Sequence, residues 1–311
     1  MVQPGILLAQ TVVSGQASEL DSETRLLIRM ITMEPQISSM SQVSPSAQLG
    51  KGVVVGPFCL VGPDVIVGDF TDLTSHVVLS GRTTLGCHNK LYPGCVIGGE
   101  PQDVSYQESS TEVCIGDENV FREGVTVNRG AEKEDHITRI GNRNMFMANS
   151  HVAHNCRIYD DVILVNGVLL GGHVHVHDRA IVSGNTVVHH FSTIGKLSFV
   201  SGGCRVPHDI PPFMLAAGSD NPTLKTINVV GMRRAGISEH SIEVIRTAFR
   251  MLFRKRKTLA EVHEYFDETL DGVKPMELSL LLRFIEDQRA GRLGRAREVV
   301  RVQGSEGRKA A

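Results

Sequence analysis

The chain has 311 residues, of which 41% are hydrophobic and 21% are charged, with a formal net charge of −2. This balance excludes an intrinsically disordered chain and provides no overall basic excess to attract nucleic acid. No window approaches the roughly 18 apolar residues of a membrane-spanning helix. The six cysteines form no C-x-x-C pair, which favours reduced thiols in a cytoplasmic protein over a disulfide or zinc framework.

Residues 1–36 precede the regular pattern described below. Their apolar stretch GILLAQTVV has no cationic residue before it, so we do not expect a secretory signal peptide. We expect a flexible extension or a start assigned too early, with Met30 and Met33 as alternative starts.

A six-residue period follows. An apolar residue recurs at every sixth position from Ile37 to Ile97, and the period returns in a second phase from Ile140 to Val206. Helices repeat every 3.6 residues and strands every two, so neither explains this spacing. A repeated hexad predicts a parallel β-helix, in which each hexad supplies a short strand and a corner.

The hexads also predict how the core is built. If three hexads close one triangular coil, residues 18 apart stack on the same face or edge. The inward column of Val, Leu and Ile would then stabilise the prism by about 1.5–3 kcal/mol per fully buried side chain. We therefore predict a mainly β fold, with the prism over residues 37–228 and small residues at its corners.

Two polar segments, 99–113 and 129–138, interrupt the period and are expected to leave the prism as loops. After Asn228 the apolar spacing changes to three and four, which predicts a small α-helical domain over residues 229–290. The last stretch, 291–311, is predicted to be a basic tail.

Three segments within that domain carry the helical spacing. Ser238 and Thr258 are the expected N-caps of the first two. The predicted helices are residues 237–254, 258–270 and 275–290.

The 18-residue coil predicts a histidine cluster. His154, Gly172 and His190 are 18 residues apart, so they should stack along one edge, about 5 Å apart. Three further histidines flank this edge: His151, His173 and His189. A neutral histidine here could remove a proton from a sugar hydroxyl as a general base.

A zinc site is the alternative for these histidines, since three imidazoles and a water suit zinc. The run HVHVHD at 173–178 places histidines at alternate positions. The same alternation suits a solvated outer face, and we therefore predict no metal.

Several strings in order resemble one family: SHVAHNC (150–156), LLGGHV (169–174), VVHHF (187–191), DIPPF (209–213) and INVVGMRRAGIS (227–238). They are similar to the bacterial UDP-N-acetylglucosamine O-acyltransferases, which begin lipid A synthesis. The resemblance covers residues 37–290. It implies a left-handed β-helix, a cytoplasmic homotrimer with active sites between neighbouring prisms, and no cofactor.

The resemblance also implies roles for individual residues. His154 resembles the base that deprotonates the glucosamine 3-hydroxyl, which attacks a 3-hydroxyacyl thioester on acyl carrier protein. The amide of Gly172 resembles the oxyanion donor, and Gly202 the residue that sets acyl-chain length. The residues that resemble substrate contacts are Gln102, Asp103, His151, His173, His189, His190, Asn228 and Arg234, the last two for the nucleotide.

Four positions depart from the family pattern. Ser105 stands where a lysine is usual, and Asn155 where an aspartate often follows the catalytic histidine. Val230 replaces an acidic residue expected at the nucleotide, and His190 occupies a common glutamine position. The sequence alone therefore leaves open a 3-hydroxyl or a 3-amino acceptor.

A basic cluster near the end of the first predicted helix suits the acidic carrier protein. Favourable interaction with the helix dipole is the plainer explanation, but five cations within eight residues exceed that need. These cations are Arg250, Arg254, Lys255, Arg256 and Lys257.

Other functions remain possible at this stage. The same prism could carry a sugar N-acyltransferase or an acetyltransferase dependent on coenzyme A. A zinc carbonic anhydrase would have two histidine ligands five residues apart, a spacing absent between residues 151 and 190. A non-catalytic scaffold would not need the stacked edge of His154, Gly172 and His190.

Overall fold

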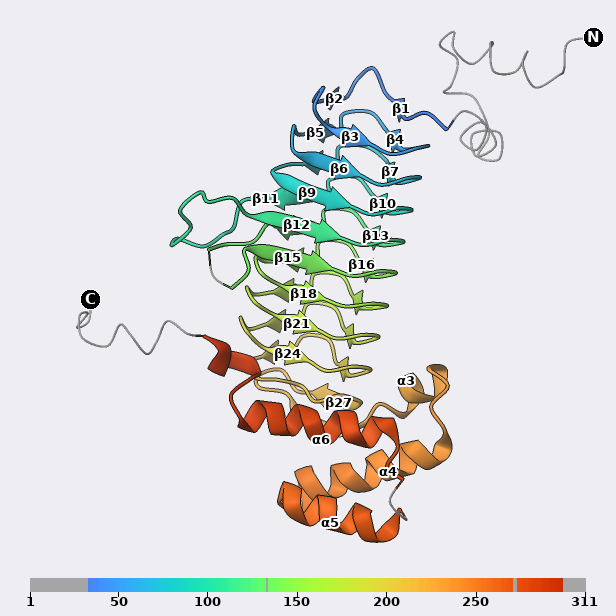
Figure 1. The fold of residues 1–311 in the computed structure, drawn as a ribbon, viewed down its shortest axis with the longest axis vertical. Coiled ribbons are helices and arrows are strands. Elements are labelled where there is room, and N and C mark those ends of the chain that lie inside the picture. The colour runs from blue at the N-terminus through green and yellow to red at the C-terminus, as the bar shows by residue number, and fades with distance from the viewer. Residues whose placement is uncertain (1–32, 133, 271–272, 299–311) are drawn as a thin grey trace, which may run out of the picture.

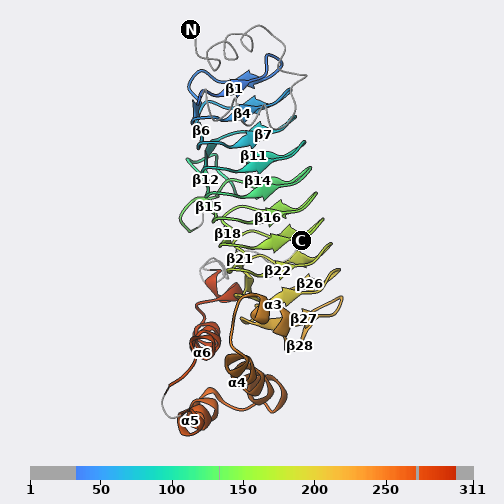
Figure 2. The same ribbon diagram turned by 90° about the vertical axis from the view of Figure 1, so that its right-hand side faces the viewer.

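The computed structural model describes residues 33–132, 134–270 and 273–298, so most of the predicted N-terminal extension lies outside the described residues. The chain winds into a long three-faced prism, with a small group of helices at its C-terminal end (Figures 1 and 2). The three faces are sheets, which we name A, B and C, and their strands pair in parallel except for the last pair of sheet A. Within the described part of the chain, no helix is long and apolar enough to cross a bilayer.

Each coil contributes one strand to each sheet. Sheet A contains, in spatial order, β1 (Gln36–Ile37), β4 (Val54–Val55), β7 (Asp72–Leu73), β10 (Lys90–Leu91), β13 (Val120–Phe121), β16 (Met145–Phe146), β19 (Ile163–Leu164), β22 (Ile181–Val182), β25 (Phe199–Val200), β27 (Met214–Ala217) and β28 (Thr223–Ile227). Sheet B contains β2 (Gln42–Val43), β5 (Leu60–Val61), β8 (Val78–Leu79), β11 (Val96–Gly99), β14 (Thr126–Asn128), β17 (His151–Val152), β20 (Leu169–Leu170), β23 (Val187–Val188) and β26 (Arg205–Val206). Sheet C contains β3 (Gln48–Leu49), β6 (Val65–Val67), β9 (Arg82–Leu85), β12 (Glu112–Ile115), β15 (Ile137–Ile140), β18 (Arg157–Ile158), β21 (His175–Val176) and β24 (Thr193–Ile194).

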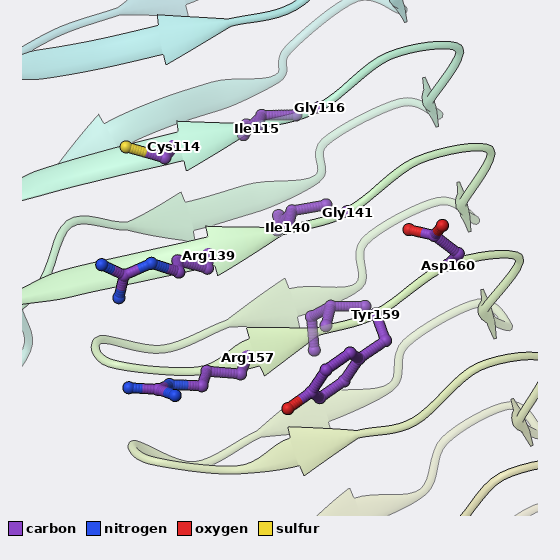
Figure 3. A pocket seen from close by; sticks show the side chains of 10 residues that line it. Cys114, Ile115, Gly116, Arg139, Ile140, Gly141, Arg157, Tyr159 and Asp160 are labelled. Carbon is purple, nitrogen blue, oxygen red and sulfur yellow. The ribbon is translucent and has the colours of Figure 1, made fainter.

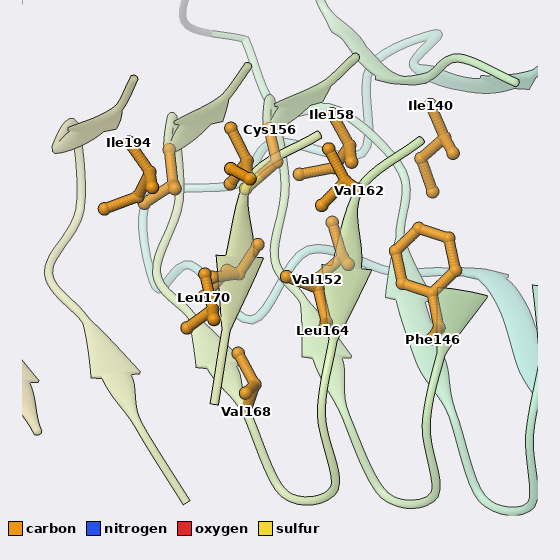
Figure 4. Packing of buried hydrophobic residues seen from close by; sticks show 14 of the residues in the cluster. Ile140, Phe146, Val152, Cys156, Ile158, Val162, Leu164, Val168, Leu170 and Ile194 are labelled. Atoms are coloured by element: carbon orange, nitrogen blue, oxygen red, sulfur yellow. The ribbon is translucent and has the colours of Figure 1, made fainter. Parts of the chain in front are cut away.

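The predicted 18-residue register is present. Val152 pairs with Leu170, and Leu170 pairs with Val188. All three residues are buried, and Figure 4 shows Val152 and Leu170 pointing into the core. The phenylalanine rings of Phe121 and Phe146 stack in the same column with centroids 4.7 Å apart, within a core that is otherwise mostly aliphatic.

The corners differ from the expectation of small residues. Many carry a larger side chain with a positive φ, as at Asn155 (57°), His173 (62°) and Phe191 (65°). This left-handed conformation is unfavourable for most L-residues. The coil hydrogen bonds help to hold it, because the His173 amide donates to the carbonyl of His154, 3.0 Å away.

Both predicted loops leave the prism at one edge. The pairing from β11 to β14 spans 30 residues instead of 18, because residues 100–111 loop out between sheets B and C. Residues 129–136 leave at the same edge, between β14 and β15. The strands on either side stay paired, so the insertions extend from the prism without interrupting its sheets.

The C-terminal region is helical as predicted. Ser238 caps α4, and Thr258 forms a capping box with Glu261 at the start of α5. The β27–β28 hairpin was not predicted, because it does not follow the hexad period. The helix α3 lies within the predicted helical domain but ahead of the first helix predicted there. The helical elements are α3 (Val229–Arg234), α4 (Glu239–Phe249), the π-helical turn η1 (Arg250–Arg254), α5 (Leu259–Thr269), α6 (Met276–Arg289) and the 3₁₀ turn η2 (Gly294–Arg297).

The first part of the predicted basic tail turns back toward the prism. After α6, residues 291–298 run to the strands near β24 (Figure 1). Gly294 is buried there, with a positive φ of 63°. A side chain at Gly294 would lie 2.6 Å from the Asp209 carboxylate, so a larger residue here would require the Asp209 side chain to move. Residues 299–311 lie outside the described residues.

Candidate active site

The stacked edge predicted from the 18-residue coil lies between sheets B and C. The Phe191 amide, one residue after His190, donates to the carbonyl of Gly172, 2.9 Å away. A side chain at Gly172 would lie 2.6 Å from the ring of His154. Both polar loops leave the prism at this edge, so the structure brings Asp103 to the same place.

His154 is held by its neighbour, Asn155. Nδ1 of His154 lies 2.9 Å from Oδ1 of Asn155. The Ala131 amide donates to the same oxygen, 2.8 Å away, and Asn155 Nδ2 donates to the Ala131 carbonyl, 3.3 Å away. Because an amide N–H can only donate, these bonds fix which end of the Asn155 side chain is the oxygen. Nδ1 of His154 therefore donates its proton, and Nε2 carries the lone pair.

Asp103 faces that lone pair. Its Oδ2 lies 3.9 Å from His154 Nε2, and both side chains are mostly buried. Its Oδ1 accepts hydrogen bonds from the amide and hydroxyl of Ser105, at 2.9 and 2.7 Å. The gap of 3.9 Å is too long for a direct hydrogen bond. Gln102, beside Asp103, is exposed.

His173 closes the inner side of the cluster. Its ring stacks on Phe191 with centroids 4.3 Å apart and meets His154 edge-on at 5.2 Å. Nδ1 of His173 lies 3.1 Å from Oε2 of Glu134, a residue of the second loop. Both ring nitrogens are buried, and neither has a well-aligned hydrogen-bond partner among the described residues.

The other predicted histidines lie around this centre. The His151 Nδ1 is 2.7 Å from the hydroxyl of Thr126. Burial and the nearby His154 lower the pKa of His151. Burial and its neighbour His189 lower the pKa of His190; the rings of these two residues are 3.7 Å apart. His151 and His190 are therefore suited to act as neutral hydrogen-bonding groups.

The HVHVHD histidines engage three separate partners. His173 contacts Glu134, His175 accepts from Arg297 at 2.8 Å, and His177 stacks on Tyr159 with ring centroids 4.6 Å apart. Within residues 33–298, apart from the three positions left undescribed, no group of three acidic, histidine or cysteine side chains is arranged to hold a metal ion.

The two residues predicted to bind the nucleotide lie at α3. Asn228 caps this helix: Oδ1 accepts from the Gly231 amide at 3.0 Å, and Nδ2 donates to the Leu197 carbonyl at 2.8 Å. Asn228 therefore has a structural function of its own. Arg234 and Val230 are exposed on the same helix. Leu197 is 43 residues beyond His154, so α3 begins a little over two coils further along the prism.

A groove of about 430 Å³ lies away from the histidines, on the outer face of sheet C (Figure 3). Asp135 forms ion pairs with both arginines of its lining, Arg139 and Arg157. We assign no substrate to this groove, because it contains none of the groups gathered around His154.

Comparison with known proteins identifies the family. Residues 209–293 match the model of the UDP-N-acetylglucosamine O-acyltransferase family, domain 2. The acyl-[acyl-carrier-protein]–UDP-N-acetylglucosamine O-acyltransferase of Sinorhizobium fredii is 43% identical over 250 residues, covering 80% of this chain and 92% of that protein. The enzyme of the same name from Gloeothece citriformis is 44% identical over 192 residues, covering 61% and 68%. The chain belongs to this acyltransferase family.

Solved structures of the family cover most of the chain. The UDP-N-acetylglucosamine acyltransferase of Francisella novicida superposes with a TM-score of 0.76 at 34% identity, over 81% of this chain and 91% of that one. The UDP-N-acetylglucosamine O-acyltransferase of Moraxella catarrhalis gives 0.77 at 34%, over 81% and 96%. The predicted left-handed parallel β-helix with a small helical domain is thus confirmed. The alternative functions considered above are not favoured.

Within this family, the departures at Ser105 and Asn155 acquire structural meaning. Ser105 positions the carboxylate of Asp103 through two hydrogen bonds. Asn155 orients His154 as an aspartate could, but without a negative charge. No contact in the described residues explains Val230.

The predicted basic cluster is exposed, but its members are not equivalent. Arg254 donates to the carbonyls of Leu224 and Lys225, at 3.3 and 2.7 Å, and so joins η1 to β28. Lys257 pairs with Glu261 one turn later. Arg250 lies 4.0 Å from Glu243, the limit for an ion pair. Lys255 and Arg256 make no ion pair within the described part of the chain.

Gly202 and Gly203 differ in backbone conformation. Gly203 has a φ of 68° and makes the turn, whereas Gly202 has no such conformation. A side chain at Gly202 would first meet the Gly184 carbonyl, 3.1 Å away. The turn therefore explains the glycine at 203 but not the one at 202.

Sequence reasoning missed Ala131, Glu134 and Arg297. Each reaches the cluster through a loop or a chain end that lies outside the hexad repeat. The acidic residues of the loop at 129–138 were the available signal for Glu134. The sequence does not tell which of them faces the prism, because the loop lies outside the repeat.

Proposed function

We propose that the chain transfers a 3-hydroxyacyl group from acyl carrier protein to the 3-hydroxyl of UDP-N-acetylglucosamine, the first step of lipid A synthesis, with His154 as general base. The observation that carries this mechanism is the orientation of His154 by Asn155. A base must present a lone pair to the hydroxyl proton, and fixing the proton on Nδ1 leaves that lone pair on Nε2.

The space beside Nε2 fits a sugar hydroxyl. A hydroxyl between His154 Nε2 and Asp103 Oδ2 could reach both, since these atoms are 3.9 Å apart. As the hydroxyl oxygen attacks the thioester carbon, its proton passes to Nε2. Asp103 then stabilises the imidazolium that forms. Gln102 is proposed to hold the sugar beside it.

Gly172 is proposed to bind the oxyanion through its amide. The absence of a side chain is needed because a Cβ would collide with the His154 ring. The acyl carbonyl can therefore approach the base and the amide together. Collapse of the tetrahedral intermediate expels the carrier thiolate, which His154 reprotonates. The products are the sugar ester and the free thiol of the carrier protein, which receives the proton that the sugar hydroxyl lost.

The remaining histidines are proposed substrate contacts. His173 offers a buried Nε2, which a substrate group could satisfy. His151, His189 and His190 line the same edge. The lowered pKa values of His151 and His190 support contacts between neutral groups.

The nucleotide is proposed to lie toward α3. Arg234, exposed at the end of this helix, can donate two parallel hydrogen bonds to the pyrophosphate. Since the Asn228 side chain caps α3, this residue would act mainly by placing Arg234. We also propose that Asn228 itself contacts the nucleotide.

We propose a cytoplasmic homotrimer. The outward side chains of sheet B include the exposed Leu60, Leu169 and Val187, whereas sheet C presents Arg82, Arg139 and Arg157. Apolar outer surfaces of this kind favour protein–protein contact. The outward side chains of sheet A are also apolar at Val54, Val120, Met145, Ile163, Ile181, Phe199 and Leu215. If sheet A of each protomer packed against sheet B of the next, three protomers would close a ring. The described cysteines are free thiols, which suits the reducing cytoplasm.

Carrier-protein docking is proposed at Arg250, Lys255 and Arg256, with Arg254 and Lys257 adding charge at the margin. Gly202 is proposed to leave space for the far end of the acyl chain.

The test of the proposed function is an assay of the purified protein with UDP-N-acetylglucosamine and a panel of 3-hydroxyacyl carrier proteins, analysed by mass spectrometry. A product heavier than the sugar nucleotide by one 3-hydroxyacyl group supports the proposal. No such product with any chain length contradicts it.

A further inference from the structure

The C-terminal segment 291–298 places an arginine next to the histidine cluster. Arg297 lies at the end of η2, and its side chain is only 12% exposed. Gln288, near the end of α6, donates to the Asp209 carboxylate on the prism, 3.2 Å away, and Gly294 passes close to the same carboxylate. A hydrogen bond therefore joins the chain to the prism shortly before Arg297 enters the edge between sheets B and C.

The guanidinium of Arg297 connects two successive corners of the prism. Nη2 donates to the carbonyls of His173 and Phe191, at 2.6 and 2.7 Å. These two residues occupy the same corner in neighbouring coils, and both have left-handed backbone conformations. Nη1 donates to His175 Nε2 at 2.8 Å and to Glu134 Oε1 at 3.2 Å. Four acceptors around one planar group form a slot specific for arginine.

Glu134 extends this network to the catalytic histidine. One of its oxygens meets Arg297, and the other lies 3.1 Å from His173 Nδ1. Burial alone would raise the pKa of Glu134, but the contact with His173 and the charge of Arg297 lower it. Glu134 is therefore a carboxylate that joins the arginine to His173, whose ring meets His154 edge-on.

The electrostatics of the slot agree with this arrangement. Since a guanidinium only donates hydrogen bonds, His175 must accept with an unprotonated Nε2. Burial and the charge of Arg297 lower the pKa of His175 to about 2. The slot thus holds one fixed positive charge, on Arg297, opposite the carboxylate of Glu134.

We propose that Arg297 is a positioning residue for acyl transfer: from the C-terminal segment it holds His173, Glu134 and the corner after Gly172 in register with His154. Arg297 touches neither the base nor the reacting atoms. It acts on the site in two ways: through the backbone carbonyl of His173, the residue after Gly172, and through the contact of Glu134 with the His173 ring. The inference rests on the proposed role of His154.

The experiment compares Arg297→Ala with Arg292→Ala in the full-length protein. Arg292 lies in the same segment, but it is exposed and pairs only with Asp287 among the described residues. Arg297→Ala is expected to lower kcat by about 10- to 100-fold, since small misplacements of reacting groups have effects of this size. KM for the sugar nucleotide should stay near the wild-type value, and Arg292→Ala should match wild type in both constants.

Two further measurements separate positioning from simple structural support. Methylguanidine at millimolar concentration should restore part of the kcat of Arg297→Ala, and methylammonium at the same concentration should not. Glu134→Gln should lower kcat too, and the double variant should lose less than the product of the single losses, because both residues act through His173. If Arg297→Ala does not fold, Arg297→Lys takes its place, and it should keep the wild-type unfolding temperature but a reduced kcat.

The proposal is overturned if folded Arg297→Ala or Arg297→Lys retains wild-type kcat. It is also overturned if the loss of activity accompanies a lower unfolding temperature and methylguanidine restores nothing. His154→Ala, assayed in parallel, distinguishes this failure from failure of the proposed mechanism. If His154→Ala is inactive and Arg297→Ala is fully active, only the role of Arg297 is wrong.

Discussion

Asn155 Oδ1 lies 2.9 Å from Nδ1 of His154, and the same oxygen accepts the amide of Ala131. This neutral contact directs the lone pair of the proposed base toward Asp103. It takes the place of the charged contact that the family resemblance led us to expect at this position.

Replacing Asn155 by aspartate tests this relationship. A carboxylate beside Nδ1 favours the imidazolium form of His154. Since the base must be neutral before it takes a proton, the acidic limb of the pH profile of kcat/KM should move to higher pH in Asn155→Asp. Asn155→Ala, which removes the orienting oxygen, should lower kcat. An unchanged acidic limb in Asn155→Asp would show that the neighbour of His154 does not tune it.

Gly202 is the site for a test of chain length. Each additional buried methylene contributes about 0.8 kcal/mol, so Gly202→Met should shift preference toward acyl chains several carbons shorter while retaining activity on them. The measurement is kcat/KM across a panel of 3-hydroxyacyl carrier proteins. Gly203→Asn is the control, because asparagine tolerates the left-handed turn, and it should keep the wild-type preference. Equal loss at every length in Gly202→Met would assign this glycine to the fold.

Charge reversal tests the carrier-protein surface. The double variant Arg250→Glu with Lys255→Glu should raise KM for the acyl carrier protein and leave KM for the sugar nucleotide unchanged. High salt should weaken the wild-type interaction in the same direction. Arg283→Glu with Arg289→Glu, two exposed positions on α6, is the matched control. Equal effects of the two double variants would argue against a specific docking surface.

The hexad period was sufficient to predict the prism, the two loops and the stacked edge. It succeeded because each coil repeats the same burial, so Val152, Leu170 and Val188 fix the register of everything between them. Spacing in the helical region likewise located α4, α5 and α6, since apolar faces and caps are local features.

The missed parts depend on contacts between distant segments. Arg297 reaches Phe191 across 106 residues of sequence, and no repeat relates the two positions. Arg254 was predicted to bind the carrier protein from its charge, and Asn228 to bind the nucleotide from the family resemblance. Both also hold the helical region to the prism, Arg254 at β28 and Asn228 at Leu197. The chemistry of a side chain limits the contacts that it can make, and the packing of the fold determines which of them it makes.

The central claim, that His154 is the general base, is tested most directly by the turnover rate of His154→Ala. Loss of a general base typically lowers the rate by about 10²–10⁴-fold, and we expect this loss in kcat with an unchanged unfolding temperature and oligomeric state. The measurement is the initial rate of transfer from a 3-hydroxyacyl carrier protein to UDP-N-acetylglucosamine, at saturating concentrations of both. A folded His154→Ala protein that transfers the acyl group at close to the wild-type rate would contradict the account.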